Sequence, residues 1–144
     1  MSELNHNPII INYIEANRFG AYLGMEFYIA QPGVVHYSLL VKENHLATPQ
    51  SVHGGAIAGL MDAIVGVGAL SMVCEEGKVV STMEMKISFL IPVVMGDELK
   101  GVSAVLKAGK RILFMEGKIF NQNNDLIAMA TATMNAYPKE KAGY

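Results

Sequence analysis

The sequence contains a single cysteine, Cys74, among its 144 residues, which excludes an internal disulfide. One cysteine beside four scattered histidines also lacks the spacing of a zinc site, so we expect no bound metal. A chain without disulfides suits a reducing cytoplasm, where we expect the protein to be located. Because 51% of the residues are apolar, we expect residues 1–144 to fold as one domain.

Positive charge is also scarce, with 11 lysine and arginine residues against 13 acidic ones, a net charge of −2 and a pI near 6.1. The chain therefore has no broad basic field, and we expect no nucleic-acid partner. The first eight residues lack the basic start and apolar run of a secretory signal, so we do not expect secretion.

Several catalytic motifs are missing as well. The chain has no Gly-x-Ser-x-Gly elbow, no His-Glu-x-x-His and no phosphate-binding loop. The glycines of residues 66–71 lie inside an apolar run, so we interpret them as a packing face. Among the histidines, His36 is expected in the core or at an interface, and none is assigned as a base.

One long apolar segment, Ala56–Cys74, is about as long as a bilayer core requires. It carries Asp62 near its middle and is followed by Glu75 and Glu76, and no second span would shield the carboxylate. We therefore predict a helix over about residues 54–74 that is wrapped by protein, and no membrane partner.

The other elements follow from periodicity and turn residues. We predict a short N-terminal helix over about residues 8–18 and an extended stretch over 25–41, broken by Gln31-Pro32-Gly33. Antiparallel strands are predicted between residues 79 and 137, as a meander whose first strand alternates apolar odd and polar even positions over 82–89.

These elements predict an α+β hotdog fold, in which a curved antiparallel β-sheet wraps around a long central α-helix. Such a subunit leaves a sheet edge and part of the helix uncovered, and two copies can cover both. We therefore expect a homo-oligomer, a homodimer or a homotetramer formed as a dimer of dimers.

Two features of the central helix carry chemistry. Asp62 is its one ionisable side chain, and His53-Gly54-Gly55 stands at its amino end, where free N–H groups and the helix dipole favour negative charge. Gly54 and Asp62 are eight residues apart, roughly 12 Å at 1.5 Å per residue. They can act on one carbonyl only if different subunits supply them.

The residues at this point resemble the hotdog thioesterases of the phenylacetic-acid-degradation (PaaI-like) type, over about residues 19–137. The matching motifs are His53-Gly54-Gly55-Ala56-Ile57, Leu60-Met61-Asp62, Ile87-Ser88-Phe89-Leu90-Ile91-Pro92, Gly96-Asp97 and Gly109-Lys110-Arg111. The resemblance implies an acyl-CoA thioesterase that needs no cofactor, because CoA is part of its substrate.

The resemblance also implies residue roles. Asp62 would act as general base or nucleophile, assisted by Thr82, while the amides of Gly54 and Gly55 polarise the carbonyl and His53 orients the loop. Substrate or CoA contacts fall on Gln50, Ser51, Pro92, Lys107, Lys110 and Arg111, although the last three equally suit a solvated hairpin turn.

The sequence departs from the family pattern at Ala47, where relatives often carry Asn or Gln. Gln50, His45 or Asn44 replaces that polar group, or hydrolysis is slow. Two alternatives therefore remain open, namely a non-catalytic acyl-CoA binding protein and a hotdog hydratase or dehydratase. Methionines such as Met83, Met115 and Met134 line an acyl pocket or fill the core.

Overall fold

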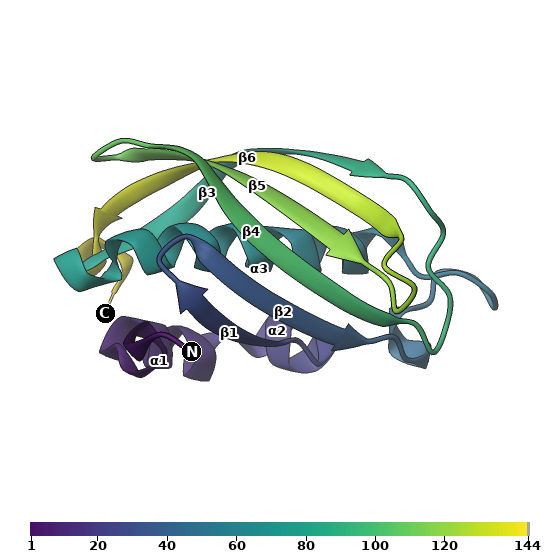
Figure 1. Cartoon of the computed structure of the whole chain (residues 1–144). Coiled ribbons are helices and arrows are strands. Elements are labelled where there is room, and N and C mark those ends of the chain that lie inside the picture. The colour runs from purple at the N-terminus through teal and green to yellow at the C-terminus, as the bar shows by residue number, and fades with distance from the viewer. Residues whose placement is uncertain (144) are drawn as a thin grey trace.

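The computed structural model describes residues 1–143, which form an antiparallel sheet curved around one long helix (Figure 1). The α-helices are α1 (Pro8–Ala16), α2 (Arg18–Leu23) and α3 (Gly54–Val73), and the 3₁₀ helices are η1 (Glu3–His6), η2 (Glu43–His45), η3 (Cys74–Glu76) and η4 (Lys139–Ala142). The strands are β1 (Glu26–Gln31), β2 (Val34–Leu40), β3 (Lys78–Phe89), β4 (Glu98–Ala108), β5 (Ile112–Phe120) and β6 (Leu126–Pro138). The predicted α+β hotdog architecture is confirmed.

The short N-terminal helix predicted over about residues 8–18 is α1, and a second helix, α2, that was not predicted follows it. Helix α1 ends at Ala16, because Asn17 leaves helical geometry. The Asn17 side chain then accepts a hydrogen bond from the N–H of Gly20 at 3.0 Å, which caps the start of α2. Gly24, with φ of 79°, ends α2 in the left-handed conformation that glycine adopts readily.

A tight turn joins β1 to β2, as Gln31-Pro32-Gly33 predicted. Gly33 has a φ of +81°, and its N–H donates a hydrogen bond to Ser71 Oγ at 2.8 Å. Its carbonyl accepts a hydrogen bond from Ser103 Oγ, also at 2.8 Å. The buried hydroxyl of Ser71 thus bonds the turn to α3, and that of Ser103 bonds it to β4.

The sheet is not the simple meander that the sequence predicted. Within residues 1–143 the strands form one six-stranded sheet in the order β1-β2-β4-β5-β6-β3. Strands β4, β5 and β6 pair consecutively, but β3 pairs with β6 and occupies an edge. The chain crosses from the end of β3 to β4 through residues 90–97 (Figure 1). Strands β3 and β4 are therefore consecutive in the chain but are not neighbours in the sheet.

Strand β3 contains a β-bulge at Met83, where its register with β6 shifts between Thr82 and Glu84. In a regular strand Thr82 and Met85 would face opposite sides of the sheet. Here the Thr82 hydroxyl donates a hydrogen bond to Asp62 of α3, and Met85 packs against the core beside Ile87, so both side chains lie on the same face. The predicted alternation with one buried face is therefore wrong at Met83, which is 62% exposed.

The central helix lies very close to the sheet because two strands carry glycine beneath it. A Cβ atom built on Gly101 of β4 would come 2.2 Å from Ile64 Cδ1, and one built on Gly117 of β5 would come 2.6 Å from Met61 Sδ. Ile64 and Met61 are fully buried, so they have little room to move aside. These glycines therefore set the distance between α3 and the sheet.

The segment Gly54–Glu76 is long and apolar enough to cross a membrane, but 72% of its most apolar window lies inside the protein. The sheet covers one side of α3, and α2 packs against the other, where Phe19 and Leu23 stand next to Gly59. A helix wrapped by protein was the expectation from Asp62 and the flanking acids.

Replacing Gly101 by Ala should destabilise the protein by about 1 to 3 kcal/mol, because the added methyl group overpacks the contact with Ile64. Gly66→Ala is a matched control on α3, where the new Cβ would meet no side chain closer than 3.9 Å. That control should be neutral or stabilising by up to about 1 kcal/mol, since alanine favours helix. Urea unfolding would measure both, and equal effects would contradict the close approach.

Candidate active site

The Asp62 side chain projects from α3 toward β3. Its Oδ1 accepts a hydrogen bond from Thr82 Oγ1 at 2.7 Å, and the side chain is exposed rather than buried. Within residues 1–143 no other hydrogen bond uses the carboxylate, so Oδ2 is open to water. A carboxylate held by one hydroxyl and wet on its other oxygen can bind and deprotonate a water molecule, or attack a carbonyl itself.

Asp62 and Thr82 border a cavity of about 340 Å³, called here the Asp62 cavity. It lies between α3, the start of β3 and the two N-terminal helices. Its lining residues are Ile9, Tyr13, Asn17, Phe19, Gly20, Met25, Gly59, Asp62, Ala63, Gly66, Leu70, Val79, Val80, Ser81, Thr82 and Met134. The acid therefore stands beside a space large enough for an organic group.

A buried tyrosine lies close to this acid. Tyr37 is 3% exposed and stacks on Phe27, with ring centroids 4.9 Å apart. Burial raises the pKa of the Tyr37 hydroxyl far above its usual range, and Tyr13 and the Asp62 carboxylate raise it further. Tyr37 therefore stays a neutral phenol.

The amino end of α3 forms a second structure. His53 is the N-cap, and its Nδ1 accepts a hydrogen bond from the N–H of Gly55 at 2.7 Å, so the ring proton is on Nε2. The N–H of Gly55 is thus engaged within its own chain. No hydrogen bond of the described residues, 1–143, uses the N–H of Gly54. Gly54 is therefore the donor that remains open at this helix end.

Gly54 borders its own cavity of about 410 Å³, called here the Gly54 cavity. Its lining residues are Val52, Gly54, Ile57, Phe89, Leu90, Ile91, Pro92, Val93 and Ile127. This lining shares no residue with that of the Asp62 cavity. One protomer therefore brings Asp62 and Thr82 together, and separately Gly54, His53 and Pro92, but it does not join the two groups.

The loop before α3 contains the polar residues that could replace the Asn or Gln missing at Ala47. His45 is 2% exposed, its Nδ1 accepts from the N–H of Lys42 at 2.9 Å, and its Nε2 lies 2.7 Å from the carbonyl oxygen of Leu23. Both ring nitrogens are occupied, so His45 has a structural role and cannot replace the missing group.

Two other candidates from the same loop lie in different positions. Asn44 donates to the carbonyl of Tyr22 at 3.4 Å. Gln50 is exposed at the loop tip, and the described part of the chain offers its side-chain amide no partner. Ser51 Oγ pairs with Thr48 Oγ1 at 2.7 Å. Of these residues, Gln50 is free to turn toward a ligand.

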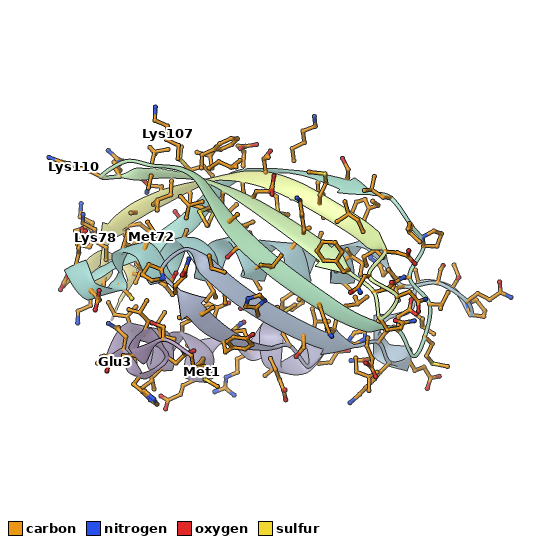
Figure 2. The ribbon with its side chains drawn as sticks, viewed as in Figure 1. Met1, Glu3, Met72, Lys78, Lys107 and Lys110 are labelled. Carbon is orange, nitrogen blue, oxygen red and sulfur yellow. The ribbon has the colours of Figure 1, made fainter. Side chains whose placement is uncertain are left out.

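The basic residues of the β4–β5 hairpin lie far from Gly54. Figure 2 shows Lys107 and Lys110 at the end of the molecule where Met72 and Lys78 lie, which is the carboxyl end of α3. Lys107, Lys110 and Arg111 are exposed, and Arg111 Nε donates to Asn135 Oδ1 at 2.9 Å. Nothing in one protomer brings these charges to the Gly54 cavity.

The described residues, 1–143, contain no group of three or more His, Cys, Asp or Glu side chains that could hold a metal ion. Of the methionines considered for an acyl pocket, Met134 lines the Asp62 cavity, Met115 is fully buried in the core and Met83 is exposed.

Sequence reasoning missed the wall that α2 contributes to the Asp62 cavity. Asn17, Phe19 and Gly20 line this wall, and Asn17 Nδ2 also donates to Tyr13 OH at 3.0 Å. Asn17 placed three residues before Gly20, with Gly24 after the segment, is the pattern of a capped short helix. That signal was present in the sequence.

Comparison with known proteins identifies the family. The family model of the thioesterase superfamily matches residues 50–128, more than half of the chain. The chain is 30% identical to human acyl-coenzyme A thioesterase 13 over 106 residues, which cover 72% of this chain and 74% of the relative. The protein therefore belongs to the thioesterase superfamily and is a thioester hydrolase.

Solved structures share its hotdog fold. The Escherichia coli PaaI protein superimposes with a TM-score of 0.83, at 22% identity and with 93% of each chain covered. A hypothetical thioesterase from Streptococcus pneumoniae, solved with coenzyme A, gives a TM-score of 0.79 at 23% identity, covering 89% of this chain and 97% of that one.

Removing the two loop histidines should have unequal effects on stability. His45→Leu leaves the N–H of Lys42 and the carbonyl of Leu23 without partners, and should cost about 2 to 4 kcal/mol. His53→Ala removes only an exposed helix cap, worth about 1 kcal/mol. Urea unfolding of both variants would test this, and a smaller loss for His45→Leu than for His53→Ala would contradict it.

Proposed function

We propose that this thioesterase hydrolyses acyl-CoA and that each active site is shared by two protomers. Asp62 of one protomer, held by Thr82, acts as general base or nucleophile. The N–H of Gly54 from its partner polarises the thioester carbonyl. The observation that carries the proposal is the pairing of a water-accessible carboxylate with an open helix amino end, in two cavities that one chain keeps apart.

The spacing along α3 explains why a second protomer is needed. Gly54 and Asp62 are roughly 12 Å apart along the helix at 1.5 Å per residue. Two copies related by a two-fold axis, with their α3 helices antiparallel, would bring the Gly54 of each opposite the Asp62 of the other. The dimer then holds two equivalent sites.

The edge of the sheet supports this dimer. Strand β3 pairs on one side only, so its other side presents unpaired backbone groups. Large apolar side chains on and after it are open to solvent in the protomer, with Met83 62%, Phe89 54% and Leu90 52% exposed. Pairing β3 with the β3 of a second copy would satisfy the backbone and cover these side chains.

Acyl-CoA as the substrate rests on two supports. The relatives include proteins named acyl-coenzyme A thioesterase and a thioesterase solved with coenzyme A. In the antiparallel dimer, the carboxyl end of each α3 would lie beside the amino end of its partner. The basic hairpin with Lys107, Lys110 and Arg111 would then lie near the partner's Gly54, where it can bind the phosphates of CoA. Gln50 and Ser51 on the loop before α3, and Pro92 in the Gly54 cavity, would contact the carbonyl or the carrier.

The chemistry requires only water and the thioester. Asp62 takes a proton from water, the resulting hydroxide attacks the carbonyl carbon, and the C–S bond breaks to release the CoA thiolate and a carboxylic acid. Negative charge on the carbonyl oxygen is stabilised by the N–H of Gly54 and the dipole of the helix that follows it. A cytoplasmic location suits a CoA-dependent enzyme whose cysteine is a buried free thiol.

The hydratase alternative finds less support in this geometry. Such a reaction uses a histidine for proton transfer, and the residues that line the Asp62 cavity include none among those described. His45 is also fully hydrogen bonded. The alternative of acyl-CoA binding without hydrolysis rests on Ala47, and the release of free thiol from CoA esters separates it from the proposal.

Asp62→Asn should lower kcat by about 10² to 10⁴, because the amide cannot accept the proton from water. Glu84→Gln is the matched control, an exposed acid on β3 that bonds Thr133 at 2.8 Å. It should retain near wild-type turnover. Thiol release from acyl-CoA measures both, with gel filtration to confirm the assembly, and wild-type turnover by Asp62→Asn would refute the assignment.

Gly54→Pro should lower kcat by about 10² to 10³, because proline removes the N–H while its ring is accepted at the first position of a helix. Gly54→Ala is the control, since it keeps the N–H and its Cβ would meet only the Phe89 ring, at 3.7 Å.

Mixing the two inactive variants tests the shared site. A heterodimer of Asp62→Asn with Gly54→Pro has one site in which both groups are intact, so an equal mixture after subunit exchange should regain about a quarter of wild-type activity. Activity that stays at the level of the separate variants would show that each site belongs to one chain.

A further inference from the structure

The Asp62 cavity extends along α3 rather than ending at the acid. Its lining on that helix runs from Gly59 through Asp62, Ala63 and Gly66 to Leu70, which is one face at helical spacing. Strand β3 runs back along α3, with Thr82 at the acid and Val79 nearer the carboxyl end of the helix. The cavity is therefore an elongated chamber with the reacting groups at one end.

The opposite wall is α1, which runs in the reverse direction beneath α3 (Figure 1). Ile9, Tyr13 and Asn17 are four residues apart and all line the cavity. Ile9, Leu70 and Val79 are apolar and buried, while Asn17 begins α2, which packs against Gly59 near the acid. The chamber thus changes from polar at Asp62 to apolar at its far end.

The middle of this chamber is open because α3 carries glycine there. A Cβ atom built on Gly66 would meet nothing closer than Met134 Cε, at 3.9 Å. Gly66 therefore differs from Gly101 and Gly117, which have a side chain packed directly against them. The absence of a side chain at Gly66 leaves room for a ligand and not for a neighbouring residue.

The dimensions define the ligand. Asp62 and Leu70 are eight residues apart, roughly 12 Å along the helix, and an extended chain advances about 1.2 Å per bond, which gives about ten bonds.

We infer that this chamber holds the acyl chain of the thioester, and that Gly66 and Leu70 determine the chain length accepted, with a preference for straight apolar chains of about eight to ten carbons. This inference rests on the proposed function, since it takes Asp62 as the group at the thioester. Gly66 controls passage through the middle of the chamber, and Leu70 with Ile9 and Val79 closes its end.

The test compares chain-length profiles of thiol release, with straight-chain acyl-CoAs from acetyl to palmitoyl. Gly66→Leu should lower kcat/KM for octanoyl-CoA and longer chains by roughly tenfold or more, with acetyl-CoA changed by less than about threefold. Gly66→Ala should fall between wild type and Gly66→Leu. Leu70→Ala should move the optimum toward longer chains.

Ala16→Leu is the matched control, because it adds the same side chain at an exposed position on α1 that does not line the Asp62 cavity. Its profile should match wild type. An unchanged profile in Gly66→Leu, or an equal loss at every chain length in a folded dimer, would overturn the inference while Asp62→Asn still tests the proposed function separately. If Gly66→Leu does not fold, the direction of the shift in Leu70→Ala decides.

Discussion

The short distance between α3 and the sheet is the constraint on which the rest of the structure depends. Gly101 and Gly117 allow the helix to lie against the strands, and buried side chains of α3 fill the space that the missing side chains leave. With that face of the helix fully used, the opposite face must meet α1, α2 and β3. Asp62 lies on this second face, where the contacts are looser and a cavity remains.

The polar groups of the site are held by local hydrogen bonds. His53 caps α3 through Gly55, and Thr82 holds Asp62 by one hydrogen bond. The cap at Gly55 leaves the N–H of Gly54 available to a ligand, and the bond from Thr82 leaves Oδ2 of Asp62 available. In the proposed dimer each protomer contributes two half-sites, and the unpaired edge of β3 is the surface by which a second copy would complete them.

Much of the fold could be predicted from the sequence because its signals are local. The apolar run of α3, the Gln31-Pro32-Gly33 turn and the polar turns between the last strands each specify structure over a few residues. The pairing of β3 with β6 could not be predicted, since strand order depends on contacts between residues far apart in the chain. The bulge at Met83 also escaped, because Thr82-Met83-Glu84-Met85 reads as regular alternation.

The site was predicted unevenly for similar reasons. Residue types and helical spacing pointed to Asp62 and Gly54, the family resemblance pointed to Thr82, and the structure does bring Thr82 to Asp62. Hydrogen bonds that occupy a group are invisible in a sequence, so the engaged N–H of Gly55 and the fully bonded ring of His45 were not foreseen. The α2 wall was overlooked although Asn17 and Gly24 mark its two ends.

The bulge in β3 has a consequence for how this chain can change during evolution. Deleting Met83 would restore a regular strand and leave Thr82 and Met85 two residues apart, so both would stay on the face that they share now. Pairing Met83 into the ladder without losing a residue would instead put Thr82 and Met85 on opposite faces, and would separate either the threonine from its acid or Met85 and Ile87 from the core. Descendants of this gene can therefore lose the bulge residue, but they cannot straighten the strand with Met83 in place.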